Sequence, residues 1–180
     1  MEARHPFGPG AIVGFRGKNS WLSTWARNPV RGFPTAEHAY QALKRPSDAD
    51  AIRAIVHPRD IPRVCVLGWD ASAGMKTIIG EAFALTSPMA GRLLATGDKA
   101  LICTDNEFRG MKINRAGYIL GYNTYGKILM EQRELLKTQL EKVVKLQRRW
   151  REALVNPEYE ICRRVRMKGF EELAKEMSSW

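Results

Sequence analysis

The run 35–44 (TAEHAYQALK) constrains this chain most, because its apolar residues recur at helical spacing. At about 100° per residue they share one face of a short helix that we expect over residues 35–45. These residues are Ala36, Ala39, Tyr40 and Leu43. Thr35 can cap the helix, and Pro34 favours a clean start just before it. One side of this helix is therefore expected to be buried.

Glu37, Gln41 and Lys44 form a second stripe on the same helix, at the edge of its buried face. Folding alone does not require a carboxylate, an amide and an ammonium there. Glu37 lies in the first turn, where the helix dipole favours its ionised form. Polar pairs four residues apart are also common on ordinary solvated helix flanks. The spacing by itself leaves a functional and a purely structural interpretation open.

Length and composition indicate a globular protein with one domain. The chain has 180 residues, of which 44% are hydrophobic and 27% charged, as is typical of soluble domains that bury a core. It contains no apolar run of about 18 residues, so we expect no membrane span and no membrane partner. The N-terminal residues lack an apolar signal core, which predicts a cytoplasmic location.

The cysteines and histidines are few and dispersed. They are Cys65, Cys103, Cys162, His5, His38 and His57. Their spacing fits neither a disulfide framework nor a metal site, so we expect no metal and no cofactor. A nucleophilic Cys103 would need an activating base, and the sequence offers no Cys-His or Ser-His-Asp arrangement.

The net charge of +10 is the second clue to function. A basic surface attracts phosphate groups, whether in nucleic acid or in a small ligand. Part of the excess is local, because residues 137–180 contain 11 Lys or Arg against 7 Glu. Charge alone fits a general role in solubility equally well.

The pattern predicts an α+β fold in which helices dominate and strands are few and short, followed by a helical C-terminal extension. Helices are expected over residues 35–45, 48–56, 75–85, 88–95, 126–154 and 158–177, the last broken or bent near Gly169. Strands are expected over 11–15 and 100–103, and loops over 17–32 and 104–117. In the long helix we expect seven residues to face inward: Ile128, Leu129, Leu135, Leu136, Leu140, Val143 and Val144. The chain has no Gly-rich βαβ fingerprint, which argues against a Rossmann fold.

Two loops could carry chemistry. Asp105, with Phe108 three residues later, could position a ribose or a water molecule, or could form an ordinary Asx turn. Residues 121–126 (GYNTYG) offer Gly121 and Asn123 near a helix N-terminus. That arrangement suits a phosphate, but any turn into a helix uses such residues.

The tryptophans also have two interpretations. Trp69 could stack on a base, although a tryptophan in the core is the commoner case. Trp21 and Trp25 lie in a loop-rich stretch, and we expect them to anchor the core rather than bind a ligand.

Several ordered sequence blocks together resemble the NADAR family, the YbiA-like N-glycosidases, from about Ile12 to Leu136. The strongest block, 33–44 (FPTAEHAYQALK), is similar to the family's aromatic-Pro-Thr-Ser-Glu-His block with its following Gln and Lys. Residues 121–136 are similar to a second block that contains Gly-x-Asn and Leu-Met-x-x-Arg. Shorter blocks lie at 93–97 (LLATG), 105–108 (DNEF) and 21–25 (WLSTW).

The chain departs from the family pattern in several places. Thr24 stands where the family has Asn, and Phe108 with Arg109 stand where it has Trp-Gly. Ala82 replaces the Lys of a Lys-Phe pair, and the stretch 69–75 is shorter than usual. These changes retain both carboxylates but alter ring stacking and loop shape.

The resemblance implies an N-glycosidase domain over residues 1–136 and a basic helical extension over 137–180. Family members cleave N-glycosidic bonds to ribose, and no metal is needed. The substrates implied are ADP-ribose attached to guanine in DNA or RNA, and phosphoribosylated pyrimidine intermediates of riboflavin synthesis. By position, Glu37, Trp69 and Asp105 correspond to the residues of the family's site.

We therefore expect an enzyme that removes ADP-ribose from a modified base. The oxocarbenium-like transition state of such a reaction requires a nearby carboxylate. We assign Glu37 to ribose C1 and Asp105 to ribose or water, and the reverse assignment stays open. Lys44 would contact phosphate, or form a Schiff base with opened ribose. The other expected substrate-binding residues are Ser23, Trp69, Phe108, Gly121 and Asn123.

Two rival classes of function also stay open. One is a non-catalytic module that binds ADP-ribose or nucleic acid, which would suit the changes at Phe108 and Arg109. The other is a basic interaction protein whose C-terminal helices dock a partner.

Overall fold

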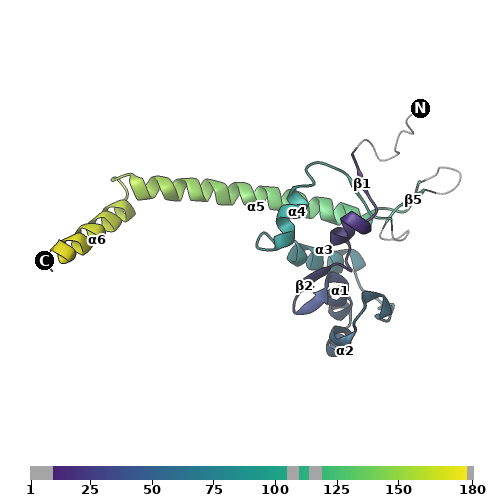
Figure 1. Cartoon of the computed structure of the whole chain (residues 1–180). Coiled ribbons are helices and arrows are strands. Elements are labelled where there is room, and N and C mark those ends of the chain that lie inside the picture. The colour runs from purple at the N-terminus through teal and green to yellow at the C-terminus, as the bar shows by residue number, and fades with distance from the viewer. Residues whose placement is uncertain (1–9, 105–109, 114–118, 178–180) are drawn as a thin grey trace. The chain divides into compact units, whose positions relative to one another are not determined.

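The computed structural model describes residues 10–104, 110–113 and 119–177. The chain divides into two compact units, Met1–Lys137 and Thr138–Trp180, and each is described by itself. The fold is α+β with dominant helices and a few short strands (Figure 1). This confirms the fold class expected from the sequence.

The helices and strands of the described residues follow one another with short connections. The strands are β1 (Ile12–Val13), β2 (Arg27–Val30), β3 (Phe33–Thr35), β4 (Leu101–Ile102), β5 (Lys112–Ile113) and β6 (Ile119–Leu120). The α-helices are α1 (Ala36–Lys44), α2 (Ala49–Ala54), α3 (Ala71–Ala82), α4 (Pro88–Leu94), α5 (Thr124–Val155) and α6 (Glu160–Met177). Short 3-10 helices are η1 (Gly17–Leu22), η2 (Pro46–Asp48) and η3 (Pro58–Asp60).

The strands pair two by two. β1 lies parallel to β4, whereas β2 with β3 and β5 with β6 form antiparallel pairs. The loops expected over 17–32 and 104–117 are therefore partly wrong, since β2 lies in the first and β5 in the second. The β2–β3 hairpin escapes sequence patterns because β2, RNPV, is only four residues long, contains a proline and shows no clear alternation of apolar residues. Its turn uses Arg31 and Gly32 at φ values of 52° and 74°.

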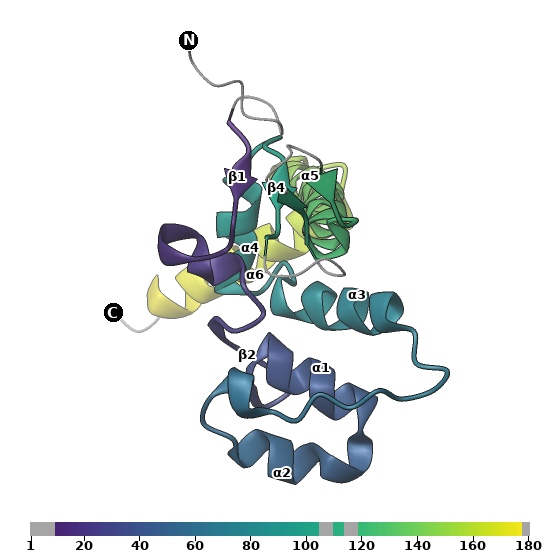
Figure 2. The same ribbon diagram turned by 90° about the vertical axis from the view of Figure 1, so that its right-hand side faces the viewer.

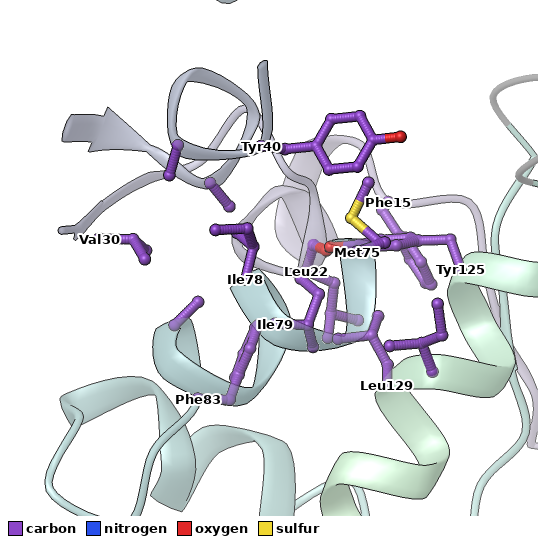
Figure 3. Close-up of a cluster of buried hydrophobic side chains, with 14 of the residues drawn as sticks. Phe15, Leu22, Val30, Tyr40, Met75, Ile78, Ile79, Phe83, Tyr125 and Leu129 are labelled. Atoms are coloured by element: carbon purple, nitrogen blue, oxygen red, sulfur yellow. The ribbon is translucent and has the colours of Figure 1, made fainter. Parts of the chain in front are cut away.

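The core of the first unit forms where α1, α3 and the beginning of α5 meet. α1 packs against both α2 and α3 (Figure 2). Side chains from α1, α3 and α5 pack together in this core with Phe15 and Leu22 from the N-terminal segment (Figure 3). Among them, Phe15 meets Tyr125 edge-on with ring centroids 5.7 Å apart. This packing fixes the segment 15–24 against α5.

The helix α3 begins at Ala71 rather than at the expected residue 75. The reason is a strong cap, since Asp70 Oδ1 accepts hydrogen bonds from the backbone N–H groups of Ser72 and Ala73, both at 2.9 Å. Gly74 lies in the first turns of this helix because any side chain there would collide with the ring of Trp69.

Asn123 fastens the beginning of α5 to β4. Its Nδ2 donates to the carbonyl oxygen of Leu101 at 2.9 Å, and its Oδ1 accepts from the N–H of Cys103 at 3.0 Å. The residue is buried and adopts a φ of 50°, which asparagine tolerates better than most side chains. Gly126 sits one turn later, against the same carbonyl of Leu101.

The long helix has a buried and an exposed part. Of the seven residues expected to face inward, Ile128, Leu129 and Leu136 are buried, whereas Leu135, Leu140, Val143 and Val144 are exposed. Helical periodicity identifies an apolar face, but it does not reveal whether a neighbour covers that face. α6 runs without a break through Gly169, so of the expected break or bend the break is wrong. None of the helices in the described part of the chain is long and apolar enough to cross a membrane.

We predict that Gly126→Ala destabilises the first unit by about 2–4 kcal/mol, because a Cβ there would overlap the Leu101 carbonyl oxygen and the Asn123 amide. Gly91→Ala is the matched control, since Gly91 lies in α4 with open space around it. That change should stabilise by about 0.5–1 kcal/mol, the difference in helix propensity. Urea unfolding followed by tryptophan fluorescence measures both values. Equal stabilities of the two variants would contradict the prediction.

Candidate functional site

Glu37 lies deeper than the sequence suggests. Glu37 is 2% exposed and Gln41 is 3% exposed. These two residues are therefore buried and do not lie at the edge of a buried face, as was expected. All residues from Ala36 to Ala42 are buried. The extra cover comes from β2, β3 and the segment before them, which pack on α1. A buried carboxylate needs hydrogen-bond partners, since its desolvation is costly.

Among the described contacts, two side chains donate to the Glu37 carboxylate, one to each oxygen. Thr24 Oγ1 donates to Oε2 at 3.0 Å, and Gln41 Nε2 donates to Oε1 at 2.9 Å. The backbone N–H of Glu37 also donates to the carbonyl oxygen of Thr24 at 2.9 Å. These contacts fix the orientation of the carboxylate.

One atom of the Gln41 amide, its oxygen, has no described hydrogen-bond partner. This oxygen, Oε1, is buried. Reversing the amide would point this oxygen at Glu37 and create a repulsive contact, so the orientation with Nε2 toward Glu37 is the favourable one. An acceptor for a hydroxyl therefore lies beside the carboxylate.

His38 is fully buried next to Glu37 in sequence, yet it faces elsewhere. Its Nδ1 lies 2.7 Å from Thr35 Oγ1, and its Nε2 lies 2.9 Å from the carbonyl oxygen of Ile55. The carbonyl requires Nε2 to carry the proton, so Nδ1 accepts from the Thr35 hydroxyl. Both ring nitrogens thus serve the packing of α1.

A cavity of about 550 Å³ opens beside this carboxylate. Its described lining comes from the segment 15–26, from Arg63, from Cys103 after β4, and from Tyr125 in α5. Thr24 belongs to this lining and also holds Glu37, so the carboxylate lies one side chain away from the cavity. Arg16 and Arg63 contribute positive charge to the wall.

The structure brings some of the expected site residues to this cavity. Ser23 lines it, next to Thr24. Trp25 lines it as well and is 46% exposed, so the expectation that Trp25 anchors the core is wrong. Trp21, by contrast, packs against the core, with its ring 6.4 Å from that of Phe83.

Other expected residues are engaged elsewhere. The Lys44 ammonium donates to the carbonyl oxygen of Val64. Trp69 is partly buried against Tyr40, with ring centroids 6.1 Å apart and an Nε1–Oη distance of 3.2 Å. Neither Lys44 nor Trp69 belongs to the described lining of the large cavity.

The remaining expected residues come from two loops. Gly121 and Asn123 precede α5, and the Asn123 amide bonds with the backbone of β4. Asp105 and Phe108 lie outside the described residues. Across the described ranges, no three His, Cys, Asp or Glu side chains are grouped so as to hold a metal ion.

Sequence reasoning did not single out several residues of this site, among them Thr24, Arg16, Arg63 and Tyr125. Thr24 carries a signal, since it lies within the block 21–25 where the chain departs from the family pattern. Tyr125 carries one as well, since it lies within the block 121–126, whereas Arg16 and Arg63 carry none beyond their charge. These last three residues reach the cavity from three separate segments, which only the fold brings together.

Comparison with known proteins identifies the fold. The NMR structure of the E. coli protein YbiA superposes with a TM-score of 0.57 and 24% sequence identity. The match covers 79% of this chain and 92% of that one. No family model and no curated protein matches the sequence. The chain therefore has a YbiA-like fold.

We predict that Thr24→Val lowers the free energy of unfolding by about 1–3 kcal/mol, because a buried carboxylate loses a donor while the side-chain shape is kept. Thr24→Ser retains the hydroxyl and should cost less than about 1 kcal/mol. Urea unfolding at neutral pH compares the variants. A Thr24→Val protein as stable as the wild type would show that the bond to Glu37 contributes nothing.

Proposed function

We propose that this protein is an N-glycosidase that hydrolyses the bond between a ribose and a base, most simply releasing ADP-ribose from ADP-ribosylated guanine in nucleic acid. The observation that carries the proposal is the buried Glu37 carboxylate, held on both oxygens and one side chain from a large cavity. The YbiA-like fold and the sequence blocks that resemble the NADAR family support it.

The chemistry follows from where charge develops. Breaking the N-ribosidic bond leaves positive charge on ribose C1 and on the ring oxygen. A fixed carboxylate nearby stabilises that charge without reorganisation during the reaction, and we assign this role to Glu37, which its described donors hold in place. Water then supplies its oxygen to C1. One of its protons goes to the nitrogen of the departing base, and the other stays on the new hydroxyl group.

Asp105 is proposed as the second carboxylate, which orients the ribose hydroxyls or the water molecule. It follows β4 by three residues, and Cys103 between them lines the cavity. The free acceptor of Gln41 is proposed to receive a hydrogen bond from a substrate hydroxyl or from water. Thr24 and Gln41 act through Glu37 as positioning residues.

The volume and the charge of the cavity support the proposal that the substrate carries phosphate. Its volume of about 550 Å³ lies within the range typical of ligand sites. Arg16 and Arg63 in its wall suit phosphate oxygens, since guanidinium groups bind them in a forked geometry. We therefore assign the phosphate contact to these arginines rather than to Lys44, whose ammonium bonds with Val64. A nucleic-acid substrate is consistent with the net charge of +10.

We predict that Glu37→Gln slows ADP-ribose release about a hundredfold or more while the fold is retained, because the amide cannot stabilise positive charge on ribose. The assay incubates the protein with DNA carrying ADP-ribosylated guanine and detects free ADP-ribose by mass spectrometry. Glu152→Gln, at an exposed position of α5, is the matched control and should release at the wild-type rate.

The outcomes separate the alternatives. Near-wild-type release by a folded Glu37→Gln protein would contradict the proposed mechanism. If the wild type binds ADP-ribose but neither releases it from the DNA nor cleaves a phosphoribosylated pyrimidine, the binding-module class is correct. A phosphoribosylated pyrimidine, tested in parallel, decides between a nucleic-acid and a small-metabolite substrate, since only the true substrate is cleaved.

We also predict that Arg16→Ala and Arg63→Ala each raise KM about tenfold with a smaller change in kcat, because phosphate contacts away from the reacting bond contribute mainly to binding. Arg148→Ala is the control, an exposed arginine of the second unit. Steady-state rates over a range of substrate concentration give both constants. An unchanged KM in both cavity variants would remove these arginines from the site.

A further inference from the structure

The second unit exposes large apolar side chains along one helix. In the part of α5 after Lys137 these residues are between 36% and 76% exposed: Leu140, Val143, Val144, Leu146, Trp150 and Val155. Isolated apolar residues on a surface are normal, but contiguous ones mark an interaction site. These side chains are exposed along a continuous helix, α5.

Three of these residues, Leu140, Val143 and Trp150, share one stripe of the helix with Gln147 and the partly buried Leu154, at the spacing of a coiled-coil seam. Leu140, Val143, Gln147, Trp150 and Leu154 follow one another at intervals of three, four, three and four residues. This repeat of seven places all five on one stripe of the helix, at the positions written a and d. Val144 and Leu146 flank the stripe and widen it. The seam extends over about 22 Å of helix.

The charges of the same segment lie away from the seam. Lys142, Lys145, Arg148 and Arg149 occupy the outer positions b, c and f of the repeat. Of the positions that flank the seam between Leu140 and Leu154, only Arg151 carries a charge. Two copies can therefore meet along this stripe without bringing their basic residues together. An acidic partner helix, in contrast, would find little charge to pair with at the flanks.

Gln147 also favours a second copy of this chain as the partner of the seam. A glutamine side chain both donates and accepts, so in a parallel pair it can hydrogen-bond with the same residue of the second copy. A single polar residue at position a fixes the alignment of such a pair and lowers its stability. Apolar layers at Val143 and Trp150 lie on either side of it.

We propose that residues 140–154 of α5 pair with the same segment of a second copy of this chain, as a parallel two-stranded coiled coil. The seam is short, so the interface is smaller than the standard of about 1,600 Å² and the dissociation constant lies in the micromolar range. Each copy carries a charge of +10, so added salt strengthens the pairing by screening repulsion. The proposal is independent of the proposed function.

The test is sedimentation equilibrium of the full chain at concentrations from about 1 to about 100 µM, because mass action makes the dimer fraction rise over this range. The average mass of the wild type should rise from 20.4 kDa toward twice that value. Val143→Glu places a charge in the seam and should stay at the monomer mass. Val155→Glu is the matched control: the same residue type in the same helix but at position b, so it should dimerise like the wild type.

Both valines are exposed, so neither change disturbs a core, and circular dichroism verifies the helix content. A wild-type chain that stays monomeric at the highest concentration overturns the proposal. So does a Val143→Glu protein that dimerises like the wild type, or a Val155→Glu protein that loses dimerisation equally. Association that appears only with added nucleic acid, and weakens with salt, would identify a different occupant of this face.

Discussion

The double link between Thr24 and Glu37 is the contact on which the site depends. One bond joins the backbone of Glu37 to the carbonyl of Thr24, and the other joins the Thr24 hydroxyl to the carboxylate. The first turn of α1 and the segment after η1 are thereby fastened together twice. Because Thr24 also lines the cavity, the same residue sets the position of the wall and of the carboxylate beside it. Without this link, the position of the cavity wall would not determine the position of the Glu37 carboxylate.

Two further contacts hold the other walls of the cavity. The Tyr125 hydroxyl donates to the carbonyl oxygen of Leu22 at 2.6 Å, which ties the beginning of α5 to the segment that carries Thr24. Asn123 ties that same beginning of α5 to β4, next to Cys103. Segments more than a hundred residues apart in the chain thus converge through a few buried hydrogen bonds. In such a network, the loss of one hydrogen bond costs more stability than that bond alone contributes, because each bond also fixes the geometry of the others.

The sequence predicts the helices well and the depth of the site poorly. The helix 35–45 follows from local periodicity and capping, which are properties of a short run. The burial of Glu37 depends on Thr24 and on the β2–β3 hairpin, whose short, proline-containing strand and unusual turn leave no periodic signal. The apolar face of α5 is visible in the sequence, but its exposure is not, because periodicity does not identify the neighbour. Asp105 and Phe108 stay predictions, since they lie outside the described residues.

The two described donors to the Glu37 carboxylate come from different parts of the fold. Gln41 lies one turn further along α1, whereas Thr24 belongs to the segment before β2. A movement of that segment away from α1 would therefore break one of these two bonds and leave the other in place. The carboxylate would then turn about its bond to Gln41, so the position of the cavity wall also sets the direction in which Glu37 points.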